Sequence, residues 1–476
     1  MSRWISSSGK GGGDRARRSE KNKAVAGIAL IVAICFVVAK SRTGSYSAQS
    51  GYEVPLAYDV ATDRLPRPLP PLPQLGPAGN LITDPTFHTS IVRVTDGRTR
   101  PDRPGRAYHT PSSSEANSWN VDSTVFYVTG GGGEAIPFKF DPSTLRISRF
   151  GSTASPSGGM ILPFGGEPAF SYENKNLIYG IGGPRDNFLQ EYNLETGALT
   201  DLTDIARIVP AGVGGYVGGV SNSVDDRFNI YLGGSAQDQA TFVVVWDRKT
   251  KSARVLDTGA GTVNGTNNLD MSWGWRVHNS RIDKSGRYVV ISAASGPYGL
   301  VAWDLASNRL APIGEKAGGH KGSGFGYMVN NDGYQDGAQW LLRTLFKPSA
   351  FTRLVDRELS PTEWVTDSHI SWNNSRPGIL VPALVSTYHP AASDAARRAW
   401  DDEIIGVETD GQGSTVWRFA HHRSTFKSFW DSPRGNVSQD GCFYMFTSNW
   451  ESSVGSDRQD AFVVRLPSRA CGSSRE

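Results

Sequence analysis

One unit of sequence recurs seven times along this 476-residue chain, and this recurrence limits the fold more than any other feature. Each copy has a polar turn, an apolar strand, a stretch rich in Gly or Ser, and a second apolar strand that often ends near Asp. The clearest copy runs from Asp283 to Ile291 and continues at Leu300–Asp304. The turns centre on polar residues, namely Asp122, Asn174, Asp225, Lys284, Asp332, Asn374 and Asp440. Their spacing of about 42–66 residues is typical of one four-stranded sheet per copy.

We therefore predict an all-β fold, a seven-bladed β-propeller. Seven sheets close into a ring without an exposed sheet edge. The composition agrees, because 54 Gly and 27 Pro serve many turns, and 13 Trp, 16 Tyr and 20 Phe suit pleated surfaces. A parallel α/β fold is disfavoured, since helical periodicity is nearly absent after the N-terminal apolar segment.

The two ends of the chain are expected to close the ring together. The seventh unit ends at Phe462–Leu466 with only a short polar tail after it, so it lacks an outer strand. A spare strand at Phe87–Val94 precedes the first unit and can complete the seventh blade. Cys442 and Cys471 lie near the C-terminus, and their spacing leaves open a disulfide or two unpaired thiols.

A membrane segment is predicted ahead of the propeller. Ala24–Ala39 holds sixteen residues without charge, which is slightly short for a spanning helix unless the flanking Lys side chains snorkel. Residues 1–23 are strongly basic and should stay cytoplasmic, which sends the rest outward as a single-pass, extracytoplasmic propeller, periplasmic or on the cell surface. A cleaved signal peptide is the alternative, and it exports the same body.

The remaining boundaries follow from composition. Residues 40–80 include the run Leu65–Pro73 with five prolines, which favours extended polyproline II and predicts a semi-rigid linker. Residues 81–470 are then the seven-bladed β-propeller.

Short signatures in the repeats resemble known propeller families. Trp246-Asp247 and Trp303-Asp304 resemble the strand ends of WD-repeat propellers. The turns at Asp283–Gly286 and Ser438–Gly441 resemble the Ser-Pro-Asp-Gly turn of the TolB and oligogalacturonate-lyase propellers, although the Pro is missing. These resemblances imply architecture only, because one fold hosts many functions.

Several reactive residues fall just upstream of the repeated turns, where the innermost strand of a blade should begin. His109, His278, His320 and His369 occupy such positions in units 1, 4, 5 and 6. The predicted ligand-binding residues at one channel mouth are His109, Glu115, Arg276, His278, His320, His369, Trp372 and Arg434.

A metal is the alternative interpretation of the four histidines, since imidazole is a common ligand of divalent ions. Resemblance to the oligogalacturonate-lyase propellers implies a metal held by His and Gln in the channel. A divalent ion at His109, His278, His320 and His369 would then support a metal-assisted polysaccharide lyase or related hydrolase. Interblade packing is the simpler role for these side chains, so no cofactor is the primary prediction.

We expect a non-catalytic recognition module for a glycan, a cell-envelope component or a protein. The net charge of +3 gives no reason to expect nucleic acid. Trp273, Trp275, Trp372, Trp430 and Trp450 could stack on sugar rings. The basic stretch from His421-His422 to Arg434 could bind an acidic glycan or phosphate, although a solvated loop is the simpler expectation.

Overall fold

The computed structural model describes residues 53–471, except 183–184, 214, 216, 268–270, 314–319, 332–338, 347–349, 357–366, 389–398, 414 and 456. The predicted leader at 1–23 and membrane segment at 24–39 lie outside this range. Among the residues that it does describe, no helix has the length and apolar character needed to cross a membrane.

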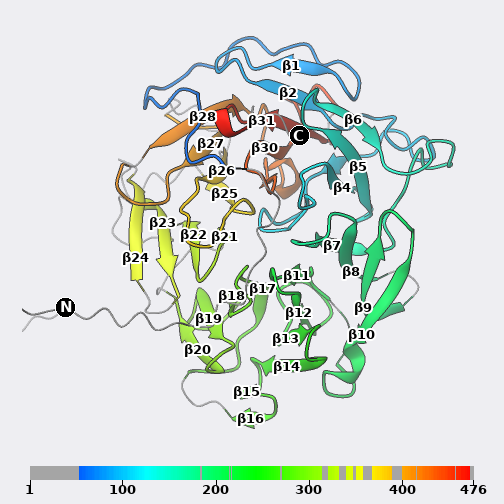
Figure 1. Ribbon diagram of the computed structural model, residues 1–476, viewed down its shortest axis with the longest axis vertical. Coiled ribbons are helices and arrows are strands. Elements are labelled where there is room, and N and C mark those ends of the chain that lie inside the picture. The colour runs from blue at the N-terminus through cyan, green and yellow to red at the C-terminus, as the bar shows by residue number, and fades with distance from the viewer. Residues whose placement is uncertain are drawn as a thin grey trace, which may run out of the picture. The chain divides into compact units, whose positions relative to one another are not determined.

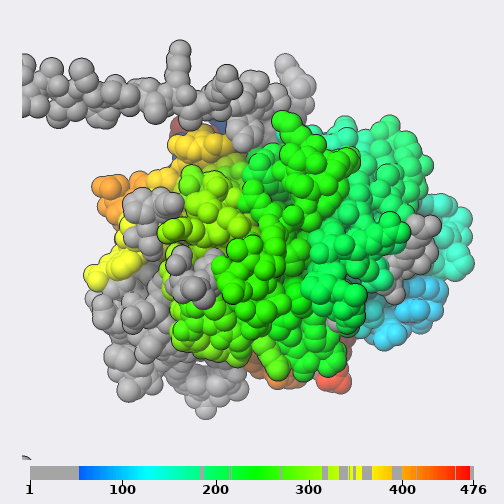
Figure 2. Space-filling model, turned by 90° about the horizontal axis from the view of Figure 1, so that it is seen from below, coloured from blue at the N-terminus to red at the C-terminus, as the bar shows by residue number. Residues whose placement is uncertain are grey.

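Seven antiparallel sheets radiate from a central channel, so the predicted all-β seven-bladed propeller is confirmed. In Figure 1, β7, β11, β17, β21 and β25 lie nearest the centre, whereas β10, β14, β20 and β24 lie at the rim. Figure 2 shows the blades following one another in sequence order, with the green residues of blades 3 and 4 beside the teal residues of blade 2.

The blades have the following strands. Blade 1 has β3 (Tyr108–His109), β4 (Val125–Gly130), β5 (Ala135–Asp141) and β6 (Arg146–Arg149). Blade 2 has β7 (Gly165–Phe170), β8 (Leu177–Gly182), β9 (Arg185–Asn193) and β10 (Leu199–Asp204), followed by the 3-10 helix η1 (Ile205–Arg207). Blade 3 has β11 (Ser221–Asn222), β12 (Arg227–Leu232), β13 (Phe242–Asp247) and β14 (Ser252–Asp257), extended by β15 (Thr262–Val263) and β16 (Thr266–Asn267).

Blade 4 has β17 (Val277–Ile282), β18 (Tyr288–Ala293), β19 (Leu300–Asp304) and β20 (Arg309–Pro312). Blade 5 has β21 (Lys321–Ser323), β22 (Tyr327–Asn331), β23 (Gln339–Leu345) and β24 (Ala350–Asp356). Blade 6 has β25 (Asp367–Ser371), β26 (Ala383–Tyr388), β27 (Glu403–Val407) and β28 (Val416–His421), followed by η2 (Phe429–Asp431). Blade 7 has β29 (Gly435–Val437), β30 (Phe443–Ser448) and β31 (Asp460–Arg465), and η3 (Arg469–Cys471) follows.

The N-terminal strands complete blade 7. β2 (Ser90–Arg93) pairs with β31, and β1 (Leu81–Thr83) pairs with β2. The predicted closing strand is therefore confirmed. Cys442 and Cys471 form a disulfide that ties the C-terminal tail to β30. Both ends of the propeller are thus fixed to one blade.

The repeated polar turn joins the inner strand of a blade to its second strand. Asn120 Oδ1 accepts the backbone N–H groups of Thr124 and Val125, each at 2.9 Å. Asp283 Oδ1 accepts those of Arg287 and Tyr288 in the same pattern. Such side chains replace backbone partners in a tight turn, which explains why polar residues recur there. Second strands such as β4 and β18 are buried on both faces between neighbouring blades, where the core lies.

Part of the segment predicted to be a semi-rigid linker packs against the propeller. The Tyr58 ring packs edge-on against Trp417 and Phe419, with centroids 5.7 and 4.9 Å away. Arg418 of β28 donates to Asp63 Oδ1 at 2.9 Å, and Trp450 Nε1 donates to the Pro73 carbonyl at 3.0 Å. From residue 58 to residue 73 the segment is therefore part of the folded propeller.

Candidate functional site

The seven inner strands run in one direction along the channel, so their starts and their ends form two different mouths. The proximal mouth is defined here as the one where inner strands begin, and the distal mouth as the one where they end. His109 and His369 lie on the inner strands β3 and β25. His320 directly precedes β21, and Arg434 directly precedes β29. All four residues therefore belong to the proximal mouth.

Blades 5 and 6 bring two histidines, an aspartate and a tyrosine together. The rings of His320 and His369 have centroids 4.2 Å apart. His320 Nδ1 lies 3.1 Å from Asp367 Oδ1, and Tyr388 donates its hydroxyl to Asp367 Oδ2 at 2.8 Å. Asp367 and His369 share one face of β25 because they are two residues apart. The sequence reasoning missed Asp367 and Tyr388, and this i, i+2 spacing was the available signal for Asp367.

The two imidazoles of this group differ in protonation. Burial disfavours the charged form of His320, yet the hydrogen bond and charge of Asp367 outweigh it and raise the pKa of His320. Burial holds the pKa of His369 well below its usual value, and the neighbouring His320 lowers it further. His369 is therefore the neutral member of the pair.

Blades 7 and 1 supply a cation beneath two aromatic rings. The Arg434 guanidinium is fully buried and lies 4.2 Å from the Phe429 ring centroid and 4.9 Å from that of Trp430. The His109 ring stacks on Trp430 with centroids 4.6 Å apart. Phe429 and Trp430 remain about half exposed, at 49% and 45%. The aromatic pair thus lies between solvent and a buried cation.

Burial shifts the pKa values of both polar groups beneath the aromatic pair. It lowers the pKa of His109 to about 3, with the charge of Arg434 adding to the effect. Burial also lowers the pKa of Arg434 to about 10, which still leaves it charged at neutral pH.

No described residue compensates Arg434. Its Nε, Nη1 and Nη2 atoms are all buried without a hydrogen-bond partner, as are His109 Nδ1 and His369 Nε2. The carboxylates of Glu167 and Asp431 lie close enough to raise the pKa of Arg434 by their charge, but both accept hydrogen bonds from other groups. Glu167 accepts from Arg281 and from the backbone N–H of Ser113. Asp431 likewise accepts hydrogen bonds from Asn449, Gln459 and Ser428.

The loop between β28 and β29 holds the aromatic pair in place. Asp431 accepts from Asn449 Nδ2 at 3.1 Å and from Gln459 Nε2 at 2.8 Å, and its second oxygen accepts from Ser428. Within the same loop, Phe426 stacks on Tyr388 with centroids 5.1 Å apart. Aromatic rings from one loop therefore contact both halves of the proximal mouth.

His278 and Arg276 are not part of this group. His278 lies on β17, where its Nδ1 is 2.5 Å from Asp238 Oδ1 and its side chain is 44% exposed. Arg276 precedes β17 and is exposed. In the described part of the chain, no group of three His, Cys, Asp or Glu side chains could hold a metal ion. The four histidines predicted as ligands therefore do not fit one coordination sphere.

Glu115 and Trp372 lie deeper than predicted. Glu115 Oε2 accepts from Lys321 Nζ at 3.0 Å inside the channel, and both side chains are buried. Trp372 follows β25, is 1% exposed, and donates to the Val381 carbonyl at 3.0 Å. Of the five tryptophans predicted to stack on a ligand, Trp275, Trp372 and Trp450 are each 1% exposed, so they serve the core.

The basic stretch is also buried at its start. His421 and His422 are fully buried, and Arg423 is 3% exposed with Glu451 as its partner at 2.8 Å. The expected solvated loop is therefore wrong for these three residues.

The distal mouth is closed by a lysine. Lys284 is 3% exposed, and its Nζ donates to the carbonyls of Asn373 and Ser375 across the channel. Its ammonium group also lies 4.8 Å from the Tyr172 ring centroid. Burial holds the pKa of Lys284 well below its usual value. The cavity that remains here is only about 20 Å³.

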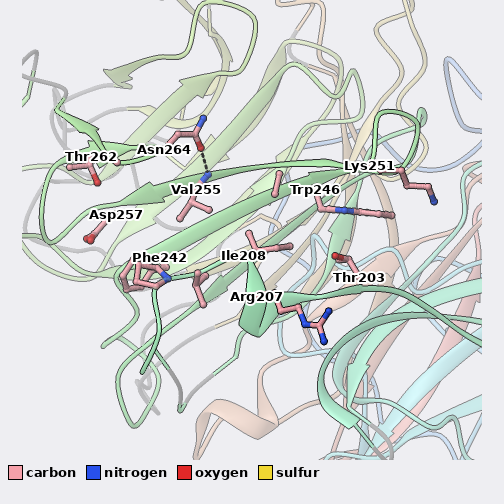
Figure 3. A pocket seen from close by; sticks show the side chains of 14 residues that line it. Thr203, Arg207, Ile208, Phe242, Trp246, Lys251, Val255, Asp257, Thr262 and Asn264 are labelled. Carbon is pink, nitrogen blue, oxygen red and sulfur yellow. Dashed lines mark hydrogen bonds between the residues drawn. The ribbon is translucent and has the colours of Figure 1, made fainter.

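A larger pocket of about 710 Å³ lies away from both mouths, between the outer parts of blades 2 and 3 (Figure 3). Its lining includes Ile208, Phe242, Trp246 and Val255, and Asn264 Oδ1 accepts the Val255 N–H at 2.8 Å. Its lining includes no histidine, so the chemistry described above lies elsewhere.

Comparisons with known proteins agree on the fold. No protein-family model and no curated protein matches the chain. Among solved structures, an oligogalacturonate lyase in complex with manganese is similar, with a TM-score of 0.55 at 12% identity over 82% of this chain and 96% of that one. An oligogalacturonate lyase from Vibrio parahaemolyticus gives a TM-score of 0.52 at 10% identity over the same shares. TolB from Acinetobacter baumannii matches only at a TM-score of 0.29 and 10% identity, over 64% of this chain and 63% of that one. At such identities the likeness concerns the fold alone.

Proposed function

We propose that this propeller is a non-catalytic recognition module that binds an acidic glycan at its proximal mouth. The observation that carries the proposal is the buried Arg434, which has three unpaired nitrogens and no free carboxylate beside it. An unpaired buried charge is costly, so a site that keeps one is poised for a ligand that supplies the opposite charge.

The groups around Arg434 suit a sugar that bears an acid. A guanidinium forms strong, directional hydrogen bonds with oxyanions. Phe429 and Trp430 are half exposed next to it, and aromatic faces provide the apolar contact that sugar rings need. Arg434 can therefore bind the acidic group of a sugar while the aromatic pair contacts the ring of the same sugar.

A polysaccharide lyase is the second candidate, favoured by neutral His369 beside the His320–Asp367 pair. A neutral imidazole near a bound carboxylate can remove the adjacent proton. Two of the similar solved structures are oligogalacturonate lyases, one in complex with manganese. Because the four predicted histidines do not fit one metal site, binding is the function that the geometry supports better.

The proposal includes a tether to the outer side of a membrane. The basic residues 1–23 and the apolar run Ala24–Ala39 support it. The Cys442–Cys471 disulfide also supports an oxidising compartment. Membrane fractionation followed by protease treatment of intact cells tests this placement, because a cytoplasmic propeller would stay protected.

Matched dextrans test the recognition function. Full-length chain should bind carboxymethyl dextran or dextran sulfate and ignore unmodified dextran, which has the same backbone. Arg434→Gln should abolish binding. Arg207→Gln removes the same charge next to blade 2 and should bind like the unmodified chain. Equal binding of the neutral polymer, or full binding by Arg434→Gln, would contradict the proposal. Release of ultraviolet-absorbing unsaturated products from polygalacturonate would instead favour the lyase.

A further inference from the structure

We infer that the acidic group bound at the proximal mouth is a tetrahedral oxyanion, a sulfate or phosphate ester, rather than a carboxylate. The inference rests on the proposed function and specifies its ligand. Its basis is that three neighbouring blades each present one buried, unpaired nitrogen group, whereas such an ester has three terminal oxygens.

The three groups come from blades 6, 7 and 1 in order. They are His369 on β25, Arg434 before β29, and His109 on β3, and their exposures are 5%, 0% and 5%. Each has at least one buried side-chain nitrogen without a hydrogen-bond partner among the described residues. Arg434 lies close enough for its charge to lower the pKa of both histidines.

Hydrogen bonds between the blades fix these groups in place. Thr110 Oγ1, next to His109, donates to the Arg434 carbonyl. The Val437 N–H at the end of β29 donates to Ser371 Oγ at the end of β25, at 3.1 Å. His109 also stacks on Trp430, which limits its rotation. The arrangement is therefore preorganised, so little ordering opposes ligand binding.

The number of oxygens that each anion offers distinguishes a carboxylate from a tetrahedral ester. A carboxylate has two oxygens, and Arg434 alone can engage both in a bidentate pair. His109 and His369 would then stay buried and unpaired, which is unfavourable. A tetrahedral ester keeps a third oxygen and extends out of one plane, so the imidazoles on the flanking blades gain partners. Each neutral imidazole carries one N–H to donate.

The carboxylates of the protein near this mouth leave Arg434 free for a ligand anion. Glu167 and Asp431 are engaged by other groups, so no protein carboxylate competes for Arg434. The other acid of this mouth, Asp367, is held by His320 and Tyr388. The cation is therefore available to the ligand alone.

Calorimetric titration of the full-length chain tests the inference with inorganic sulfate, inorganic phosphate and acetate as probes. We expect sulfate or phosphate to bind at least about 10-fold more tightly than acetate, the ratio that one extra paired buried group provides. The sulfate and phosphate arms show which ester is preferred. His109→Phe keeps the stack on Trp430 but loses the nitrogen, so it should weaken the preferred oxyanion about 10-fold and leave acetate unchanged. Arg207→Gln should change neither.

Three outcomes would overturn the inference, and they can be told apart. If acetate and carboxymethyl dextran bind as tightly as sulfate, phosphate and dextran sulfate, the tetrahedral preference is wrong while acidic-ligand recognition stands. If none of these probes binds, both fail. An unchanged affinity ratio in a folded His109→Phe variant also contradicts the inference.

Discussion

At the distal mouth the buried cation Lys284 donates to two carbonyls, whereas at the proximal mouth the buried cation Arg434 donates to no described residue. The same seven inner strands build both mouths. The distal groups are satisfied within the protein, and the channel is nearly filled there. The proximal groups are buried but unsatisfied. This difference is the observation behind our proposal that the proximal mouth binds a ligand, whereas the distal mouth stabilises the ring.

The largest expected effect comes from removing the unpaired cation. Arg434→Gln should weaken binding of the acidic ligand by 100-fold or more, about 3 kcal/mol, because a buried charge–anion contact is lost. The same change should raise the free energy of unfolding by about 2 kcal/mol, since an uncompensated buried charge disappears. Thermal unfolding and titration on one sample measure both. A destabilised variant would mean that Arg434 serves the fold.

The corresponding change at the distal mouth should have the opposite sign. Lys284→Met keeps the apolar stem but leaves the carbonyls of Asn373 and Ser375 without their donor. We expect a loss of about 1–3 kcal/mol in the free energy of unfolding, because unsatisfied buried acceptors are costly. Ligand affinity should stay unchanged. A fall in affinity as large as that of Arg434→Gln would remove the distinction between the mouths.

The parts of the fold that the sequence predicts are those with a strong apolar pattern. The strand expected at Leu300–Asp304 is β19 with the same bounds. The shortest inner strands were not predicted because they are brief and carry polar residues. β3 and β11 have two residues each, and the channel rather than a core faces them. Outer strands such as β10, with the sequence LTDLTD, are mostly exposed and lack an apolar signal as well.

The site was predictable only in part for a related reason. Position upstream of a turn places a residue at the start of an inner strand, and this grouped His109, His320, His369 and Arg434. Position does not give the direction of a side chain around the ring, so it also included His278, which pairs with Asp238 in blade 3. Tyr388 lies at the end of β26, the second strand of blade 6, and its distance in sequence from the other site residues follows no regular spacing.

Acid should lower the free energy of unfolding through the buried histidines of the proximal mouth. The pKa of His109 is about 3 in the folded chain, whereas an unfolded histidine titrates near 6.5. Between these values the unfolded chain binds more protons, so the free energy of unfolding falls as the pH drops below about 6.5. His109 alone should account for about 1 kcal/mol between pH 6.5 and 5.5.

Two histidines near His109 also affect how stability depends on pH, and they act in opposite directions. His369 has a lowered pKa and acts in the same direction, whereas His320 has a raised pKa and stabilises the fold below its unfolded pKa. His109→Gln should flatten the pH profile of chemical denaturation between pH 6.5 and 5.5. Parallel profiles for His109→Gln and the unmodified chain would contradict the assignment.

The smallest effect should come from the half-exposed aromatic cover of the proximal mouth. Trp430 lies over Arg434 at 4.9 Å and over His109 at 4.6 Å, so Trp430→Ala loses one cation–π contact and one stack. We expect a three- to five-fold weaker affinity, about 0.5–1 kcal/mol, since the half-exposed ring no longer offers its face to the sugar. Because Arg434 becomes more accessible, the association rate should hold or rise, and the loss should appear in dissociation. Stopped-flow binding separates the two rates. Phe351→Ala, which removes a 61% exposed ring from blade 5, is the control and should change neither rate.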